Sequence, residues 1–164
     1  ELRSPLRDDG AWRAVAMLAY DREYLYLAVH AAKAPGAEYA PAGGTRPRDA
    51  DLADRDRFEL LIDIDRDYTT CYRLAVDHRG WTAEDLWGDT TWNPEWFVAA
   101  AADDGTWTIE AAIPLEQLDA APPARGTAWG LGLKRIVPGA GIQSWNSPAA
   151  VDVMPEGLGY LLFE

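Results

Sequence analysis

The sequence predicts an all-β protein, namely an antiparallel two-sheet β-sandwich with about eight to ten strands and little helix. Three observations support this prediction. Apolar and polar residues alternate with period two in several short segments, as in strands that have one face in a core. Turn-forming residues separate these segments at fairly regular intervals. Only residues 115–118 are expected to form a helical turn.

The clearest pattern is a hairpin within residues 54–80. Phe58, Leu60 and Ile62 lie on one face of an extended chain, and the pattern resumes at Tyr72 after a turn. This face belongs in a core, whereas the opposite face is polar. We look for a binding site on the polar face, which carries Glu59, Asp63, Asp65 and Arg73.

The other elements follow from the same alternation. Residues 32–53 and 81–94 lack it, and we expect a long loop and an irregular aromatic segment there. A single domain would span residues 1–164, with residues 1–10 frayed, in an immunoglobulin-like or jelly-roll-like arrangement. The remaining expected strands cover residues 12–19, 24–31, 96–102, 107–113, 129–136, 142–145 and 159–163.

Composition excludes several classes of function. The net charge of −12 argues against nucleic acid and anionic membranes as partners, since both need a basic surface. No run of about 18 apolar residues exists, so we expect no membrane insertion. Cys71 is the single cysteine, which leaves no internal disulfide and no cysteine-based metal site.

The eight tryptophans divide into two groups. Trp12, Trp107 and Trp129 lie inside alternating segments and are expected in the core. The others lie in or beside turn-rich segments, where an indole can stay open to stack on the C–H face of a sugar ring. These others are Trp81, Trp87, Trp92, Trp96 and Trp145.

The tryptophans in these turn-rich segments predict a site where a sugar ring stacks on an indole. Carboxylate, amide and guanidinium groups can orient sugar hydroxyls by hydrogen bonding. In this mechanism Glu59 and Arg135 orient the hydroxyls, and affinity is micromolar or weaker. Alternatively, the same indoles cap the ends of the sandwich. The predicted ligand-binding residues are Trp87, Trp92, Trp145, Glu59, Arg73, Arg135 and Asn146.

A calcium site is also expected. Asp63, Asp65 and Asp67 alternate at the end of the hairpin and could supply oxygen ligands. They lack the glycine and terminal glutamate of an EF-hand loop. The alternative is an acidic hairpin end that aids solubility.

Catalysis and haem binding have weaker support. The sequence contains no nucleophile elbow, phosphate loop or His-x-x-x-His pair, so we expect no enzyme. Glu59 and Glu110 could form a glycosidase pair only if they shared a face, and we expect them on separate faces. A haem-binding electron-transfer domain is the less favoured alternative, with ligands from Met17, Met154, His30 or His78.

Several segments resemble carbohydrate-binding module family 9 and its DOMON-like relatives. Residues 56–63 (DRFELLID) resemble the family's D-x-x-E-hydrophobic-x-I-D strand, and residues 72–77 with Gly80 resemble its next strand and turn. Residues 107–114 (WTIEAAIP) look like its most recognisable signature. Residues 130–135, 144–145 and 159–161 fit its closing strands, so the resemblance covers roughly residues 12–164.

The resemblance implies a calcium-containing β-sandwich that binds a polysaccharide or oligosaccharide. It further implies a module of a secreted, periplasmic or cell-surface protein, with neighbouring domains of a parent protein as partners. Glu59 falls at a sugar-contacting glutamate of the family. The family's first tryptophan would fall near Ala53 and its second near Asp152 or Val153. Its sugar-contacting arginine would fall near Ala75.

Two outcomes therefore stay open. Either Trp87, Trp92 or Trp145 replaces the missing stacking residues, or the domain is a structural or interaction module with an eroded sugar site. The chain begins at Glu1 without a methionine or signal peptide, from which we expect an excised domain.

Overall fold

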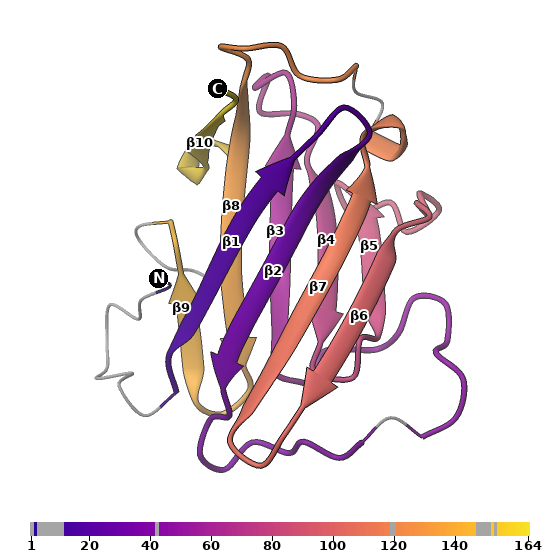
Figure 1. Ribbon diagram of the computed structural model, residues 1–164, viewed down its shortest axis with the longest axis vertical. Coiled ribbons are helices and arrows are strands. Elements are labelled where there is room, and N and C mark those ends of the chain that lie inside the picture. The colour runs from indigo at the N-terminus through magenta and orange to yellow at the C-terminus, as the bar shows by residue number, and fades with distance from the viewer. Residues whose placement is uncertain (1, 3–11, 42, 119–120, 147–151, 153) are drawn as a thin grey trace.

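The computed structural model describes residues 2, 12–41, 43–118, 121–146, 152 and 154–164, which form two antiparallel sheets packed face to face (Figure 1). This arrangement confirms the predicted all-β sandwich. The expectation that residues 1–10 are frayed falls outside the described residues, apart from Leu2, which bridges to Ala14. No helix in the described parts of the chain is long and apolar enough to cross a membrane.

The front sheet has the strand order β1-β2-β7-β6 (Figure 1). Two hairpins form it, as predicted, and β2 pairs with β7 at its centre. The predicted helical turn follows β7 as a 3₁₀ turn, Leu115–Leu118. The strands are β1 (Ala14–Tyr20), β2 (Tyr24–Ala32), β6 (Phe97–Ala102) and β7 (Thr106–Pro114).

The back sheet has the order β10-β8-β3-β4-β5, and its central strands β3 and β4 form the predicted hairpin. The short strands β10 and β9 share one edge of β8, because β10 pairs with residues 128–131 and β9 with residues 134–137. The strands are β3 (Arg57–Asp63), β4 (Tyr72–Asp77), β5 (Thr82–Leu86), β8 (Ala128–Val137), β9 (Gly141–Ser144) and β10 (Gly159–Leu162).

The core lies between the sheets and follows the alternation read from the sequence. Phe58, Leu60 and Ile62 of β3 are buried against the front sheet. The expected tryptophans, Trp107 of the front sheet and Trp129 of the back sheet, are also buried in this core. Burying such side chains removes apolar surface from water, which is the main force that holds the two layers together.

An ion pair is buried between the sheets. Arg135 donates through Nε and Nη2 to both carboxylate oxygens of Asp56, at 2.8 and 2.6 Å. It also donates to the backbone oxygens of Trp12 and Ala32, at 2.8 and 2.7 Å. The side chain of Arg135 is 0% exposed, so the prediction that it contacts a sugar is wrong. Its role is to join the two sheets.

Residues 81–94 contain a strand that the sequence did not reveal. Strand β5 pairs with β4 in this segment. Its inward residues include Thr82 and Glu84, so apolar alternation is absent. Glu84 accepts a hydrogen bond from Nε1 of Trp96. Trp96 is therefore buried, contrary to the expectation of an open indole.

Candidate functional site

A hollow of about 400 Å³ lies on the outer face of the back sheet. This is the polar face of the β3–β4 hairpin, where the sequence analysis placed a candidate site. Lys134 of β8 lies directly opposite Glu59 of β3, and Arg73 of β4 lies opposite Asp85 of β5. Because alternate residues of neighbouring strands face the same side, these four charged side chains meet on one surface.

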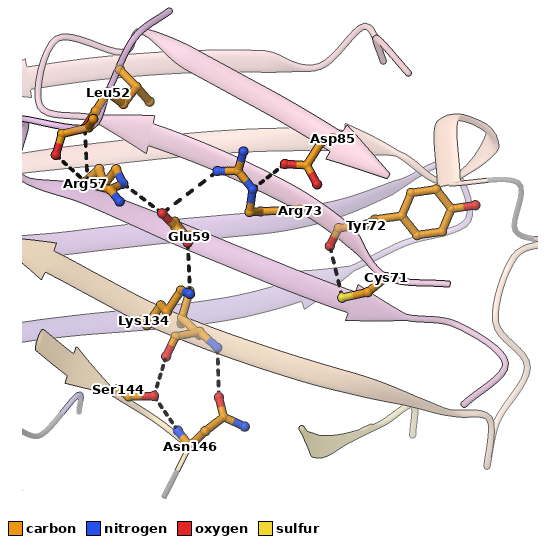
Figure 2. Close-up of polar contacts among 12 residues, drawn as sticks. Leu52, Arg57, Glu59, Cys71, Tyr72, Arg73, Asp85, Lys134, Ser144 and Asn146 are labelled. Carbon is orange, nitrogen blue, oxygen red and sulfur yellow. Dashed lines mark hydrogen bonds and ion pairs between the residues drawn. The ribbon is translucent and has the colours of Figure 1, made fainter. Parts of the chain in front are cut away.

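Glu59 is the centre of a charged network on the floor of this hollow (Figure 2). Its Oε1 accepts a hydrogen bond from Nε of Arg57 at 2.8 Å, and its Oε2 lies 3.0 Å from Nζ of Lys134. Burial acts to raise the pKa of Glu59. The charge of Lys134 and the bonds from Arg57 and Lys134 outweigh this effect and lower the pKa below its usual range.

Trp87 stands at the rim of the hollow, at the end of β5. Asp85 accepts the backbone N–H of Gly88 at 2.8 Å, and the backbone N–H of Trp87 donates to the oxygen of Cys71 at 2.9 Å. These bonds hold Trp87 in a left-handed turn, with φ of 53°. Its side chain remains accessible, since the residue is 54% exposed.

The hollow can therefore offer both donors and acceptors beside an aromatic face. Guanidinium and ammonium groups donate, and carboxylates accept, which suits a ligand rich in hydroxyl groups. Cys71 also lines the hollow. Burial and the charge of Asp63 raise the pKa of its thiol to about 11, so it is protonated at neutral pH and is a poor nucleophile.

Three of the predicted ligand-binding residues, Glu59, Arg73 and Trp87, come together in the hollow. Trp92 instead packs half-buried against Tyr72, with ring centroids 4.9 Å apart. Trp145 is exposed but lies against the backbone of Gly159, outside the residues that line the hollow.

Asn146 has a structural role in place of the predicted ligand contact. It is buried beside β8, in the interval between the pairing of β10 and that of β9. Its side chain donates to the backbone oxygens of Leu131 and Gly157, at 3.1 and 3.2 Å. It also accepts a hydrogen bond from the N–H of Leu133 at 3.1 Å. The side chain thus makes the hydrogen bonds to β8 that a neighbouring strand would otherwise make between β10 and β9.

Sequence reasoning missed Arg57, Asp85 and Lys134 as site residues. The alternation in residues 57–63 places Arg57 on the same face as Glu59, so it could have been found. Asp85 and Lys134 arrive from strands that are distant in sequence. Their positions depend on strand order, which local alternation does not specify.

Asp63, Asp65 and Asp67 form a second cluster at the end of the hairpin. One carboxylate oxygen from each lies within 4.8 Å of the others. Asp63 is buried and accepts the backbone N–H groups of Arg66 and Tyr68, at 2.7 and 3.2 Å. Hard carboxylate oxygens at this spacing fit calcium, so these residues could hold the ion.

The residues considered for catalysis and haem lie on different surfaces. Glu110 is on the outer face of the front sheet, remote from Glu59, so the two cannot act as a glycosidase pair. Met17 and His30 are exposed on the front sheet, whereas Met154 lines the hollow on the back sheet. His78 is buried, with Nε2 2.9 Å from the oxygen of Ala40.

Solved structures similar to this one include two that hold a bound sugar. One is a family 9 carbohydrate-binding module from Caldicellulosiruptor kristjanssonii in complex with glucose, with 16% identity, a TM-score of 0.67, and coverage of 93% of this chain and 77% of that chain. The chain has the fold of a family 9 carbohydrate-binding module. A module of that family from the same organism in complex with cellotriose gives 17% identity, a TM-score of 0.65, and coverage of 92% and 74%.

A suspected carbohydrate-binding protein from Bacteroides uniformis is also similar to this family 9 fold, with 12% identity and a TM-score of 0.70 over 93% of this chain and 79% of that chain. No protein-family model matches the sequence, and no curated protein matches it. These structural matches confirm the predicted fold and the family 9-like resemblance. The relation to DOMON-like domains stays a prediction.

Proposed function

We propose that this domain is a non-catalytic carbohydrate-binding module that takes a saccharide into the hollow on the outer face of the back sheet. Trp87 stacks on a sugar ring at the rim, and the charged floor around Glu59 hydrogen-bonds the hydroxyls. The domain acts as part of a larger secreted, periplasmic or cell-surface protein.

One observation carries this proposal: a hollow of about 400 Å³ combines an exposed indole with charged donors and acceptors on a single sheet face. Such a combination suits the two faces of a sugar, which are the apolar C–H surface and the hydroxyl groups. The family 9 neighbours that hold glucose and cellotriose support the same class of ligand.

The test is a titration of the domain with soluble oligosaccharides, followed by tryptophan fluorescence and isothermal titration calorimetry. We expect saturable binding of at least one saccharide class with micromolar or weaker affinity. Binding that persists unchanged in both Trp87→Ala and Glu59→Gln would contradict the placement of the site. A flat response across the panel would contradict the function itself.

A second candidate is a structural or interaction module. The outer face of the front sheet supports it, because exposed apolar residues collect there. Strand pairing places Met17 beside Ala28, and Tyr26 in one row with Ala112 and Phe97. A domain of this kind would show no glycan binding. Replacing Met17 and Phe97 with serine would then weaken its association with a partner while leaving it folded.

We also propose that calcium binds at Asp63, Asp65 and Asp67. The spacing of their carboxylates and the burial of Asp63 support this assignment. The ion would neutralise charge at the end of the hairpin and so stabilise the turn between β3 and β4.

A further inference from the structure

The charged floor of the hollow has more cations than carboxylates. Arg57, Arg73 and Lys134 meet Glu59 and Asp85, which leaves one net positive charge. With Asp152 the charged lining of the hollow sums to zero, whereas the whole chain carries a net charge of −12, so the hollow is much less acidic than the molecule as a whole and only its floor is positive. A local positive charge of this kind favours an anionic ligand.

Arg73 is the cation that faces the ligand space. The side chains of Arg57 and Lys134 are 14% and 4% exposed, whereas that of Arg73 is 32% exposed. Arg57 also has other hydrogen-bond partners, since its Nη1 donates to the backbone oxygens of Leu52 and Ala53 at 3.2 and 3.1 Å.

The contacts of Arg73 with the floor involve its Nε and Nη1 atoms. Nε donates to Asp85, and Nη1 lies 3.9 Å from Oε1 of Glu59, which is too long for a hydrogen bond (Figure 2). A guanidinium has five N–H donors, so the Nη1 and Nη2 end retains donors for a ligand. Two such N–H groups match the two oxygens of a carboxylate or sulfate group.

We propose that the hollow selects an acidic saccharide, one that carries a carboxylate or a sulfate group, and that Arg73 binds the anionic group through its Nη atoms. This inference rests on the proposed saccharide-binding function. Asp152 also lines the hollow and opposes an anion. Because Asp152 is exposed, water and salt screen its charge more than they screen the charges of the floor.

Calorimetric titrations with matched saccharides test the inference. Trigalacturonic acid is compared with its methyl ester, which keeps the sugar and removes the charge. A sulfated galactan oligomer is compared with its desulfated form, and cellotriose serves as a neutral reference. We expect the acid or the sulfated oligomer to bind about ten-fold more tightly than its neutral counterpart, with an advantage that falls as salt is added.

Variants locate the effect. Arg73→Gln should remove the preference for the anionic member of the pair, whereas Arg22→Gln, in an exposed turn of the front sheet, should retain it. Should Arg73→Gln fail to fold, Asp152→Asn gives an independent measurement, because it changes only an exposed rim residue. It should tighten binding of the anionic saccharide relative to that of its neutral counterpart, and an unchanged ratio of the two affinities would overturn the acidic preference.

The outcomes separate the two proposals. Equal or tighter binding of the neutral partners would overturn the acidic preference and leave the saccharide-binding function intact. A preference for the anion that survives in Arg73→Gln would overturn the role of Arg73. Absence of binding by every saccharide would overturn the inference together with the function on which it rests.

Discussion

Trp87 joins two properties that rarely occur together, namely an exposed indole and a backbone fixed in the left-handed region. The backbone bonds of residues 87 and 88 hold the turn, so the indole itself contributes little to the fold. The indole is therefore free to stack on a sugar ring, as the proposed function requires.

The change Trp87→Ala should therefore weaken saccharide binding about ten-fold, which corresponds to about 1.4 kcal/mol, because a stacking surface is lost. The free energy of unfolding should change by less than about 0.5 kcal/mol. Calorimetry and urea denaturation measure the two effects. Phe97→Ala is the control, since Phe97 is similarly exposed on the other sheet; similar loss of binding in both variants would refute the rim as a stacking platform.

Glu59 should govern how stability changes at acidic pH. Its pKa is lowered in the folded state, so its contribution to stability is present above the ordinary pKa of 4.5 and is lost as pH falls through the lowered pKa. Glu59→Gln should reduce overall stability and flatten the decline in stability below about pH 4.5. Thermal denaturation between pH 3 and 7 tests this, with Glu110→Gln on the front sheet as control. An unchanged slope in Glu59→Gln would contradict the lowered pKa.

At the scale of single residues, the sequence predicted part of the site. The alternation around Glu59 indicated the face that carries the hollow, and it placed Glu59 and Arg73 on that face. The prediction for Arg135 was wrong, because the alternation of residues does not tell a charged side chain that points outward from one that points inward to a buried partner. A carboxylate 79 positions away in sequence satisfies Arg135, and only the fold brings the two together.

Among the elements, β8 pairs with more strands than its neighbours in the back sheet do. It pairs with β3, β9 and β10, and it carries Lys134 outward and Arg135 inward on consecutive residues. One residue thus takes part in the candidate site and the next joins the two sheets. The ion pair between Arg135 and Asp56 should therefore be essential for the sandwich.

Removing one member of this pair leaves a buried charge without its partner. Asp56→Asn should lower the free energy of unfolding by about 3–5 kcal/mol, measured by urea denaturation. Asp54→Asn, an exposed neighbour, should have little effect. The double change Asp56→Leu with Arg135→Met should cost less than Asp56→Asn alone, since no charge is then left buried. A cost for Asp56→Asn as small as that of Asp54→Asn would contradict the structural role.

Strands with an apolar inner face were predictable, and the strand without one was not. Alternation located β2, β3, β4 and β7 to within one or two residues. Strand β5 was missed because it turns Thr82 and Glu84 inward at the open side of the sandwich, where Trp96 supplies the hydrogen bond. Pairing with β4 stabilises this strand through tertiary context, which a local pattern does not record.

For the whole molecule, the net charge of −12 favours the binding of divalent cations. Bound calcium should stabilise the fold in proportion to the logarithm of its concentration, by about 2.7 kcal/mol at one hundred times its dissociation constant. The melting temperature should rise with calcium and fall with chelator. The double change Asp65→Asn and Asp67→Asn should abolish the shift, and Asp104→Asn, in an exposed turn elsewhere, should preserve it. A melting temperature that does not respond to calcium would contradict the assignment.

Most of the charged floor lies on strands that are hydrogen-bonded on both sides, namely β3, β4 and β8, whereas Asp85 lies on the edge strand β5 and Trp87 lies in the turn that follows it. A ligand that enters meets side chains whose backbone is already ordered, so little conformational entropy is lost on binding. Association and release should then be rapid, without a slow rearrangement of the protein. A parent protein that carries such a module could bind and release a polysaccharide repeatedly and so move along it.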